Sequence, residues 1–401
     1  MQKHVSKINR QKCPVCSNPE MMDFFQLKNI PVFCNVLWET RKKAMAAPLA
    51  DIHLAFCKKC GLVYNVAFDN KLMQYSDSYE NSLHFSQRFQ KWADQTADRL
   101  VQKYQLYDKD IIEIGCGQGD FLEILQRLGN NRVIGFDPSY NPNKTDISSE
   151  KPNIKIITKA YPEDFENYPA DFICCRHVLE HIEDPLQFIK SIRKTIDNKK
   201  NCVVYFEVPN ALYTFEHLGL WDIIYEHCSY FTAESLARLF LQAGFEPIEI
   251  AERYEGQFLI IEARPGRDDS NPSINQQWAI PNMQQLINNF QNVYRQKVDS
   301  WQNTLAELEN KNDRVVIWGA GSKGVTFVNT LNISYKQIEH FVDLNTRKLG
   351  KFVPGTAQNI VAPDFLKEYC PQTIIIINPI YQSEIKEDVK KFGLITNFLT
   401  G

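Results

Sequence analysis

The feature that most constrains the fold is a β-branched run followed at once by three closely spaced glycines, Ile-Ile-Glu-Ile-Gly-Cys-Gly-Gln-Gly at residues 111–119. The run predicts a buried strand, and the residues that follow, Asp120–Leu128, predict a helix. Glycines in such a turn let the backbone bend sharply and approach a ligand closely at the helix N-terminus. The unit is therefore typical of an α/β sheet that binds ligands at the carboxyl ends of its strands.

A carboxylate stands at the end of the next predicted strand, Arg132–Phe136. Asp137 follows Gly119 by 18 residues, and an acid in this position can accept hydrogen bonds from both hydroxyls of a ribose. The G-x-G-x-G spacing argues against a dinucleotide, whose sites have G-x-G-x-x-G, and there is no G-x-x-x-x-G-K-[ST] phosphate loop.

Three segments of the chain differ in pattern. Between about residues 80 and 264, short β-rich runs alternate with helical ones, which predicts a parallel sheet with crossover helices. This part ends in a linker rich in Pro, Gly, Asp and Ser, Arg264–Gln276. A long polar helix follows, from about Met283 to Lys311. A second alternation of β-rich and helical runs then starts at Arg314. We therefore predict an α/β protein with three domains: residues 1–75, 76–265 and 266–401. The strands expected in the middle domain are Ile111–Ile114, Arg132–Phe136, Ile154–Ile157, Asp171–Cys174, Cys202–Glu207 and Phe258–Ala263.

Two C-x-x-C pairs in the first segment predict a metal site. Cys13 and Cys16 form one pair, and Cys57 and Cys60 form the other. Two such pairs complete a tetrahedral four-thiolate zinc site with no open position, so the zinc is expected to be structural. The 40 residues between the pairs suggest an inserted hairpin. The alternative is four buried cysteines without a metal.

Composition excludes several classes of function. The formal net charge of −3 gives no general attraction to nucleic acid or acidic membranes. No apolar run approaches the roughly 20 residues that a membrane helix needs, and the polar N-terminus does not have the pattern of a secretory signal. The odd number of cysteines, eleven, favours metal binding or burial over disulfides. We therefore expect a cytoplasmic protein without a membrane or nucleic-acid partner.

At the glycine-rich turn the sequence resembles the class I methyltransferases that use S-adenosylmethionine (AdoMet). The resemblance implies a Rossmann-like fold in which the E-x-G-x-G-x-G segment holds the methionine part of AdoMet and Asp137 binds its ribose. Further residues would border the cofactor after the second, third and fourth strands. The complete set implied is Glu113, Gly115, Cys116, Gly117, Gly119, Asp137, Pro138, Ala160, Arg176 and His177.

Two histidine-bearing stretches are expected at the same edge of the sheet. Arg176–His181 (R-H-V-L-E-H) follows the fourth strand and should open a helix, and Tyr225–Thr232 (Y-E-H-C-S-Y-F-T) follows the fifth. Each stretch has a simpler interpretation. His177 and His181, four apart on a helix, could form a second metal site, for which no third ligand is specified. Glu226 and His227 could be a buried pair or a helix cap without a catalytic role.

The order of the segments resembles the C-methyltransferases of deoxysugar pathways over nearly the whole chain. In that family the substrate is a nucleotide-linked 4-keto-6-deoxyhexose, and a base removes the proton beside the ketone. The resemblance implies His227 as the base, Glu226 shaping its environment and His181 near the ketone. The family has a tyrosine two residues before the glutamate, where this chain has Ile224, so Tyr225 is the neighbouring candidate. Tyr79 aligns with a tyrosine-bearing stretch before the AdoMet motif.

The C-terminal segment contains a second glycine-rich turn, Gly319-Ala-Gly-Ser-Lys-Gly324, and an acid after the next strand, Asp343. This turn could bind a dinucleotide, bind the nucleotide of the substrate or serve only the fold. Two other functions remain open for the whole chain. It could methylate oxygen or nitrogen of another small metabolite, or it could be a zinc-knuckle binding protein that senses AdoMet without turnover.

Overall fold

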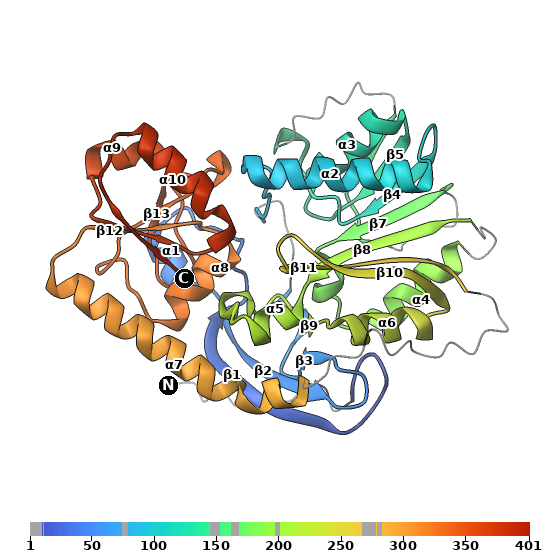
Figure 1. The fold of residues 1–401 in the computed structure, drawn as a ribbon, viewed down its shortest axis with the longest axis horizontal. Coiled ribbons are helices and arrows are strands. Elements are labelled where there is room, and N and C mark those ends of the chain that lie inside the picture. The colour runs from blue at the N-terminus through green and yellow to red at the C-terminus, as the bar shows by residue number, and fades with distance from the viewer. Residues whose placement is uncertain are drawn as a thin grey trace.

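A computed structural model of the chain describes residues 10, 12–73, 79–144, 153–161, 168–196, 201–266, 278 and 283–401. Three sheets organise the fold, and each is built mainly from one part of the sequence (Figure 1). Most of the predicted linker, residues 267–276, lies outside the described residues. Among the described helices, none combines the length and apolar character that a membrane crossing requires.

The first sheet has four antiparallel strands in the order β1-β2-β3-β9. Its first two strands form the hairpin expected between the cysteine pairs, with a short helix in the connection. Its last strand comes from a distant part of the chain, just after His227, so this sheet is tied to the second histidine stretch. The elements are β1 (Met21–Pro31), α1 (Arg41–Met45), β2 (Leu49–Cys57), β3 (Val63–Asn65) and β9 (Ser229–Tyr230).

The central sheet has seven strands in the order β10-β11-β8-β7-β4-β5-β6. Neighbouring strands are parallel except that β11 runs antiparallel to both β8 and β10. The strands are β4 (Asp110–Ile114), β5 (Arg132–Phe136), β6 (Ile154–Ile157), β7 (Phe172–Arg176), β8 (Val203–Pro209), β10 (Phe245–Arg253) and β11 (Phe258–Pro265). The helices are α2 (Gln87–Tyr104), α3 (Asp120–Gly129), α4 (Pro185–Thr195), α5 (Ala211–Glu216) and α6 (Ala233–Gln242).

Helices cover both faces of the central sheet, as Figure 1 shows with α2 and α3 above it and α4 and α6 below. On one face, Ala97 and Leu100 of α2 pack with Leu122 of α3 against Ile111 and Phe172 of the sheet. Each of these side chains is almost completely removed from water, and such burial stabilises the fold by about 25 cal/mol per Å² of apolar surface.

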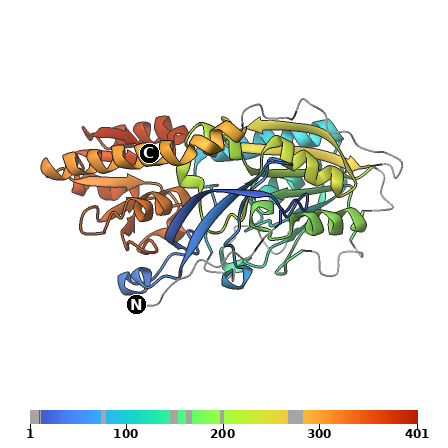
Figure 2. The same cartoon turned by 90° about the horizontal axis from the view of Figure 1, so that it is seen from below.

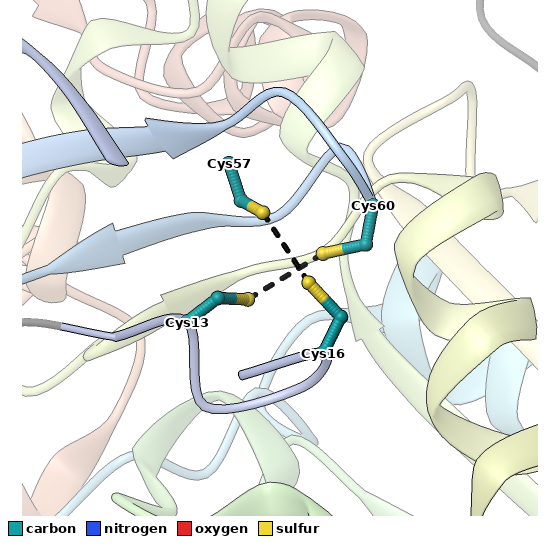
Figure 3. Close-up of side chains that lie close together, drawn as sticks. All are labelled: Cys13, Cys16, Cys57 and Cys60. Carbon is teal, nitrogen blue, oxygen red and sulfur yellow. Dashed lines mark hydrogen bonds between the residues drawn. The ribbon is translucent and has the colours of Figure 1, made fainter. Parts of the chain in front are cut away.

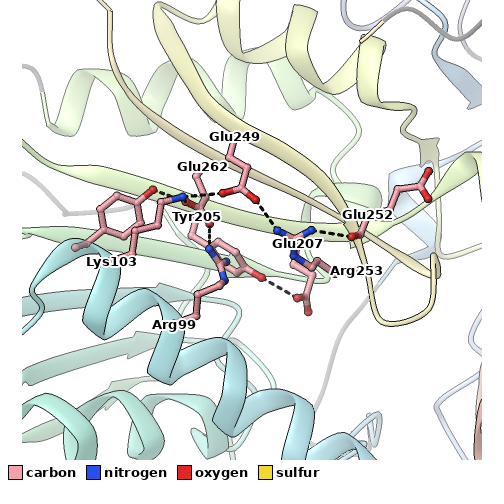
Figure 4. Close-up of polar contacts among 9 residues, drawn as sticks. Arg99, Lys103, Tyr205, Glu207, Glu249, Glu252, Arg253 and Glu262 are labelled. Atoms are coloured by element: carbon pink, nitrogen blue, oxygen red, sulfur yellow. Dashed lines mark hydrogen bonds and ion pairs between the residues drawn. The ribbon is translucent and has the colours of Figure 1, made fainter. Parts of the chain in front are cut away.

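Charged contacts join α2 to the antiparallel edge of the sheet (Figure 4). Glu262 on β11 is buried and pairs with Arg99 and Lys103 of α2 at 2.5 and 2.6 Å. Lys103 also contacts Glu249 on β10 at 2.7 Å. A buried carboxylate without partners would be costly, so these contacts fix the position of α2 across β10 and β11.

The C-terminal sheet has five parallel strands in the order β14-β13-β12-β15-β16. The strands are β12 (Val315–Trp318), β13 (His340–Val342), β14 (Asn359–Val361), β15 (Thr373–Ile376) and β16 (Asn397–Thr400). The helices are α7 (Met283–Asn310), α8 (Ser322–Thr330), α9 (Leu366–Tyr369) and α10 (Gln382–Lys391). The long helix α7 reaches from this sheet to β1, where the ring of Phe290 lies 5.1 Å from that of Phe25 (Figures 1 and 2).

Two local predictions differ from the structure. Strand β10 was not predicted, because it is an edge strand that contains Pro247 beside a shift of register, a pattern that obscures the strand signal.

The helix predicted to open at Arg176 is wrong. His177 has a φ of 55°, a short 3-10 helix follows, and α4 begins only at Pro185, capped by Asp184. Proline is favoured in the first turn of a helix and disfavours helix before it. His177 and His181 therefore do not share a helix face.

Candidate active site

A cavity of about 670 Å³ opens between the central and C-terminal sheets. Its walls include the ends of β4, β5 and β7, the end of β12, and Asn35 from the first sheet's segment. Ligand pockets typically measure about 300–1,000 Å³, so the cavity has room for a cofactor together with a small substrate.

The glycine-rich turn after β4 forms one wall. A Cβ atom added at Gly115 would lie 2.1 Å from Cγ2 of Val178, whereas one added at Gly117 would meet no atom within 4 Å. Both glycines have positive φ angles, 70° and 56°, which other residues adopt at a cost. Gly115 therefore allows close packing inside the protein, and Gly117 leaves backbone open to a ligand. Gly119 caps α3 and is not part of the cavity wall.

Asp137, at the end of β5, supports this turn. Its carboxylate accepts hydrogen bonds from the N–H of Gly117 at 2.8 Å and from the N–H and hydroxyl of Ser139 at 2.7 and 2.6 Å. A carboxylate has about four acceptor positions, so it can still accept a hydrogen bond from a ribose. Pro138 and Ala160, which the sequence predicts to border the cofactor, line the cavity beside it.

Glu113 is buried on the wall of the cavity, and its Oε2 has no hydrogen-bond partner among the described residues. Burial raises the pKa of this carboxyl to about 8, although Arg176 opposes the shift. A buried acid with an unpartnered oxygen is a costly arrangement unless a ligand completes it. The amino and sulfonium groups of AdoMet carry positive charge, so Glu113, Gly117 and Asp137 fit this cofactor.

Arg176, the last residue of β7, and His177, the residue after it, belong to a network of charged side chains. The Arg176 guanidinium bonds to Oε1 of Glu207 at 3.0 Å and lies over the ring of Phe121. His177 Nε2 is 3.1 Å from the same oxygen, and Tyr205 donates to the other oxygen at 2.9 Å (Figure 4). Burial alone would raise the pKa of Glu207, but Arg176 and His177 lower it to about 2. Glu207 is therefore ionised and holds Arg176 and His177 at the cavity.

His181 and His227 lie together in the same cavity, with ring centroids 4.9 Å apart. The short helix that carries His181 (Leu179–His181, η4) is bonded to the loop of His227, because His181 Nδ1 donates to the carbonyl of Glu226 at 2.9 Å. Burial and the neighbouring His181 lower the pKa of His227 to about 3. His227 is therefore neutral near pH 7 and available to accept a proton.

The other residues predicted in this region lie at the boundary with the first sheet. Glu226 is fully buried and accepts a hydrogen bond from the N–H of Cys34 at 2.9 Å, and the hydroxyl of Tyr225 accepts one from the N–H of Asp69 at 2.9 Å. Neither side chain lines the cavity, whereas Tyr79 does. The structure thus brings His181, His227 and Tyr79 together and turns Glu226 and Tyr225 toward the N-terminal segment.

The second glycine-rich turn, after β12, faces the same cavity. Asp343 accepts a hydrogen bond from the N–H of Ala320 at 2.8 Å, which repeats the contact between Asp137 and Gly117. Lys348 donates to the carbonyl of Ala320 at 3.1 Å, and Lys323 pairs with Asp222 of the central domain. Both lysines line the cavity.

Two residues that line the cavity, Lys348 and Glu180, were not identified from the sequence. The signal for Glu180 was its place between two histidines in R-H-V-L-E-H.

The four predicted cysteine ligands lie together at the end of the first sheet (Figure 3). The Sγ atoms of Cys13 and Cys60 are 3.5 Å apart, and those of Cys16 and Cys57 are also 3.5 Å apart. Zinc–sulfur bonds of about 2.3 Å in a tetrahedron place the sulfurs roughly 3.8 Å from one another. The donor set and its geometry therefore fit one zinc ion with all four positions taken by protein.

Comparisons with known proteins agree with this geometry. A family model described as a methyltransferase domain matches residues 84–250, and one described as a C-methyltransferase C-terminal domain matches residues 276–395. The C-methyltransferase NovU of Streptomyces niveus is 22% identical over 409 aligned residues, which cover 95% of this chain and 92% of that protein. A ubiquinone biosynthesis O-methyltransferase of Actinobacillus pleuropneumoniae is 31% identical over 125 residues, 28% of this chain and 51% of that protein.

Among solved structures, a didemethyltoxoflavin N1-methyltransferase of Burkholderia thailandensis aligns with 44% of this chain and 79% of its own, at 15% identity and a TM-score of 0.35. The first family match includes strands β4 to β8 of the central sheet, and the second includes strands β12 to β15 of the C-terminal sheet. The class I fold predicted from the first glycine-rich turn is confirmed, and so is the resemblance to C-methyltransferases. The chain is an AdoMet-dependent methyltransferase of the class I fold, and its residues 276–395 match the model of a C-methyltransferase C-terminal domain.

Proposed function

We propose that the enzyme methylates carbon in a nucleotide-linked keto-deoxysugar and that His227 is the base. The observation that carries the proposal is the shared cavity: its wall includes the first glycine-rich turn, a pair of neutral, partly buried histidines and the second glycine-rich turn. AdoMet would supply an electrophilic methyl group, so methylation at carbon requires the protein to generate a nucleophilic carbon beside it.

In the proposed reaction, His227 removes the proton from the carbon next to the ketone. The electron pair of that C–H bond moves into an enolate, which then forms the new C–C bond to the methyl group while the methyl–sulfur bond breaks. His181 donates its Nδ1–H to the carbonyl of Glu226 at 2.9 Å, which orients its ring beside His227. A positioned base typically contributes about 10²–10⁴-fold to such a step, and groups that stabilise the enolate oxygen contribute further.

The second glycine-rich turn supports a substrate with a diphosphate. The N-terminal amides of α8 and the ammonium groups of Lys323 and Lys348 border the cavity, and such groups favour phosphate oxygens. The relative named C-methyltransferase NovU is consistent with attack by carbon. We further propose that zinc bound by the four cysteines is structural, that the domains divide near residues 75 and 265, and that the enzyme acts in the cytoplasm.

The test is deuterium exchange at the carbon beside the ketone, followed without AdoMet for a panel of nucleoside-diphosphate-linked 4-keto-6-deoxyhexoses. We expect His227→Asn to lower the exchange rate about 10²–10⁴-fold while AdoMet affinity is kept. His217→Asn, which changes an exposed histidine, is the matched control. Exchange at the wild-type rate in His227→Asn would mean that another group is the base. If the wild-type enzyme exchanges no keto-sugar, O- or N-methylation of another metabolite takes the place of this proposal.

A further inference from the structure

Glu180 is a buried carboxylate at the centre of the histidine cluster. Its side chain lines the cavity and the residue is only 1% exposed. Oε1 lies 3.7 Å from Nδ1 of His177 and 4.0 Å from Nε2 of His181. Oε2 has no hydrogen-bond partner among the described residues. One side-chain oxygen of Glu180 and one ring nitrogen from each of His181 and His227 all lie within 4.8 Å of one another.

Backbone contacts hold this carboxylate against the loop of His227. The N–H of Cys228 donates to the carbonyl of Glu180 at 2.9 Å, and the Cys228 thiol lies 3.3 Å from the same carbonyl. Together with the bond from His181 to the Glu226 carbonyl, they join η4 to the loop. These contacts hold the segments that carry Glu180 and His227 against each other.

The carboxylate next to His227 in sequence has a different environment. Oε2 of Glu226 accepts the N–H of Cys34, and the side chain does not line the cavity. A positive charge on His181, His177 or Lys323 opposes protonation of His227, whereas the negative charge of Glu180 favours it. Glu226 is thus directed to the N-terminal segment, and Glu180 faces the base.

We propose that Glu180, rather than Glu226, is the carboxylate that stabilises the imidazolium formed when His227 takes the substrate proton. This role rests on the proposed function and makes Glu180 a positioning residue that acts through His227. Burial would raise the pKa of Glu180, but His177, His181 and His227 lower it below its ordinary value, so the group is ionised. Protonation of a buried imidazole is costly without a counter-charge, and an opposite charge within about 4–6 Å shifts a pKa by roughly 1–3 units.

The first arm of the test needs no substrate. Burial alone would lower the pKa of His177, but its contacts with Glu180 and Glu207 raise it to about 9, within the range of an NMR titration of ¹⁵N-labelled histidines in the full chain. Glu180→Gln should lower this pKa by about one unit or more. Glu183→Gln, an exposed carboxylate three residues away, should leave it unchanged. An unchanged His177 pKa in Glu180→Gln would overturn the proposal, because the carboxylate would then exert no charge in the cluster.

The second arm measures deuterium exchange with whichever nucleoside-diphosphate keto-sugar the wild-type enzyme exchanges. Glu180→Gln should slow exchange about tenfold or more, since each pKa unit lost by the base corresponds to as much as a factor of ten. The KM for the sugar and the Kd for AdoMet should stay within about twofold, and Glu180→Asp should recover part of the rate.

Wild-type exchange in Glu180→Gln, or an equal loss in Glu183→Gln, would overturn the assignment. A second metal ion per chain that Glu180→Gln loses would also overturn it, because Glu180 would then be a metal ligand. If the wild-type enzyme exchanges no sugar of the panel, the proposed function fails and the role of Glu180 beside a base fails with it. The His177 titration distinguishes that outcome from a carboxylate that is simply inactive in the cluster.

Discussion

Replacing Asp137 by alanine tests whether the first glycine-rich turn binds AdoMet. The carboxylate accepts three hydrogen bonds, from Gly117 at 2.8 Å and from Ser139 at 2.7 and 2.6 Å. A hydrogen bond to a charged group contributes about 1.5–3 kcal/mol, and the remaining acceptor position is the one available to a ribose hydroxyl. We expect the loss of that contact to weaken AdoMet binding by about 2 kcal/mol, which is roughly a 30-fold rise in Kd.

Isothermal titration calorimetry with AdoMet measures this change directly, and circular dichroism checks that the variant is folded. Asp343→Ala is the matched control, since Asp343 makes the equivalent contact to the N–H of Ala320 at 2.8 Å in the other turn. It should cost a similar amount of folding stability and leave AdoMet affinity unchanged. A folded Asp137→Ala protein with wild-type Kd, or an equal loss in Asp343→Ala, would refute the placement of the cofactor.

Two further predictions concern the metal and the pH dependence of binding. Metal analysis should find one zinc per chain. Cys57→Ser should lose most of this zinc and some of its thermal stability, because a structural site contributes its binding energy to folding. Full zinc retention in Cys57→Ser would contradict the prediction. The pKa of Glu113 is raised to about 8 by burial, and cationic AdoMet favours the ionised form, so AdoMet affinity should rise with pH and level off above pH 8. Glu113→Gln should remove this dependence in calorimetric titrations from pH 6 to 9, and a pH-independent affinity in the wild-type enzyme would count against the placement of Glu113.

Some features of the site could be predicted because their chemistry is local in the sequence. The glycines at residues 115–119 and Asp137 lie at the ends of neighbouring strands, and parallel strands bring their carboxyl ends to one edge. The paired cysteines needed only two tight turns to meet. The strands of the central sheet were predicted within about two residues, except β10, in which Pro247 weakens the strand pattern.

The helix predicted at Arg176 failed for a related reason. A helix was expected to open directly after the strand, but the backbone of His177 takes a left-handed conformation and α4 begins only at Pro185. That turn places His177 beside Glu207 and leaves Glu180 beside the other two histidines. No local pattern in the sequence contains this arrangement, because it depends on contacts between β7, β8 and the loop before β9.

The sequence by itself determined the class of fold, the first glycine-rich turn and the four-cysteine cluster, since each depends on residues only a few positions apart or on the edge of one sheet. The tertiary structure alone decided which carboxylate faces His227. Glu226 and His227 are adjacent, yet the Glu226 carboxylate accepts a hydrogen bond from Cys34, 192 residues away, while His227 faces the cavity. Glu180 reaches the histidine only because hydrogen bonds between two distant loops hold it there. Side chains of neighbouring residues in a loop can point to different sides, so proximity in sequence did not predict the partner.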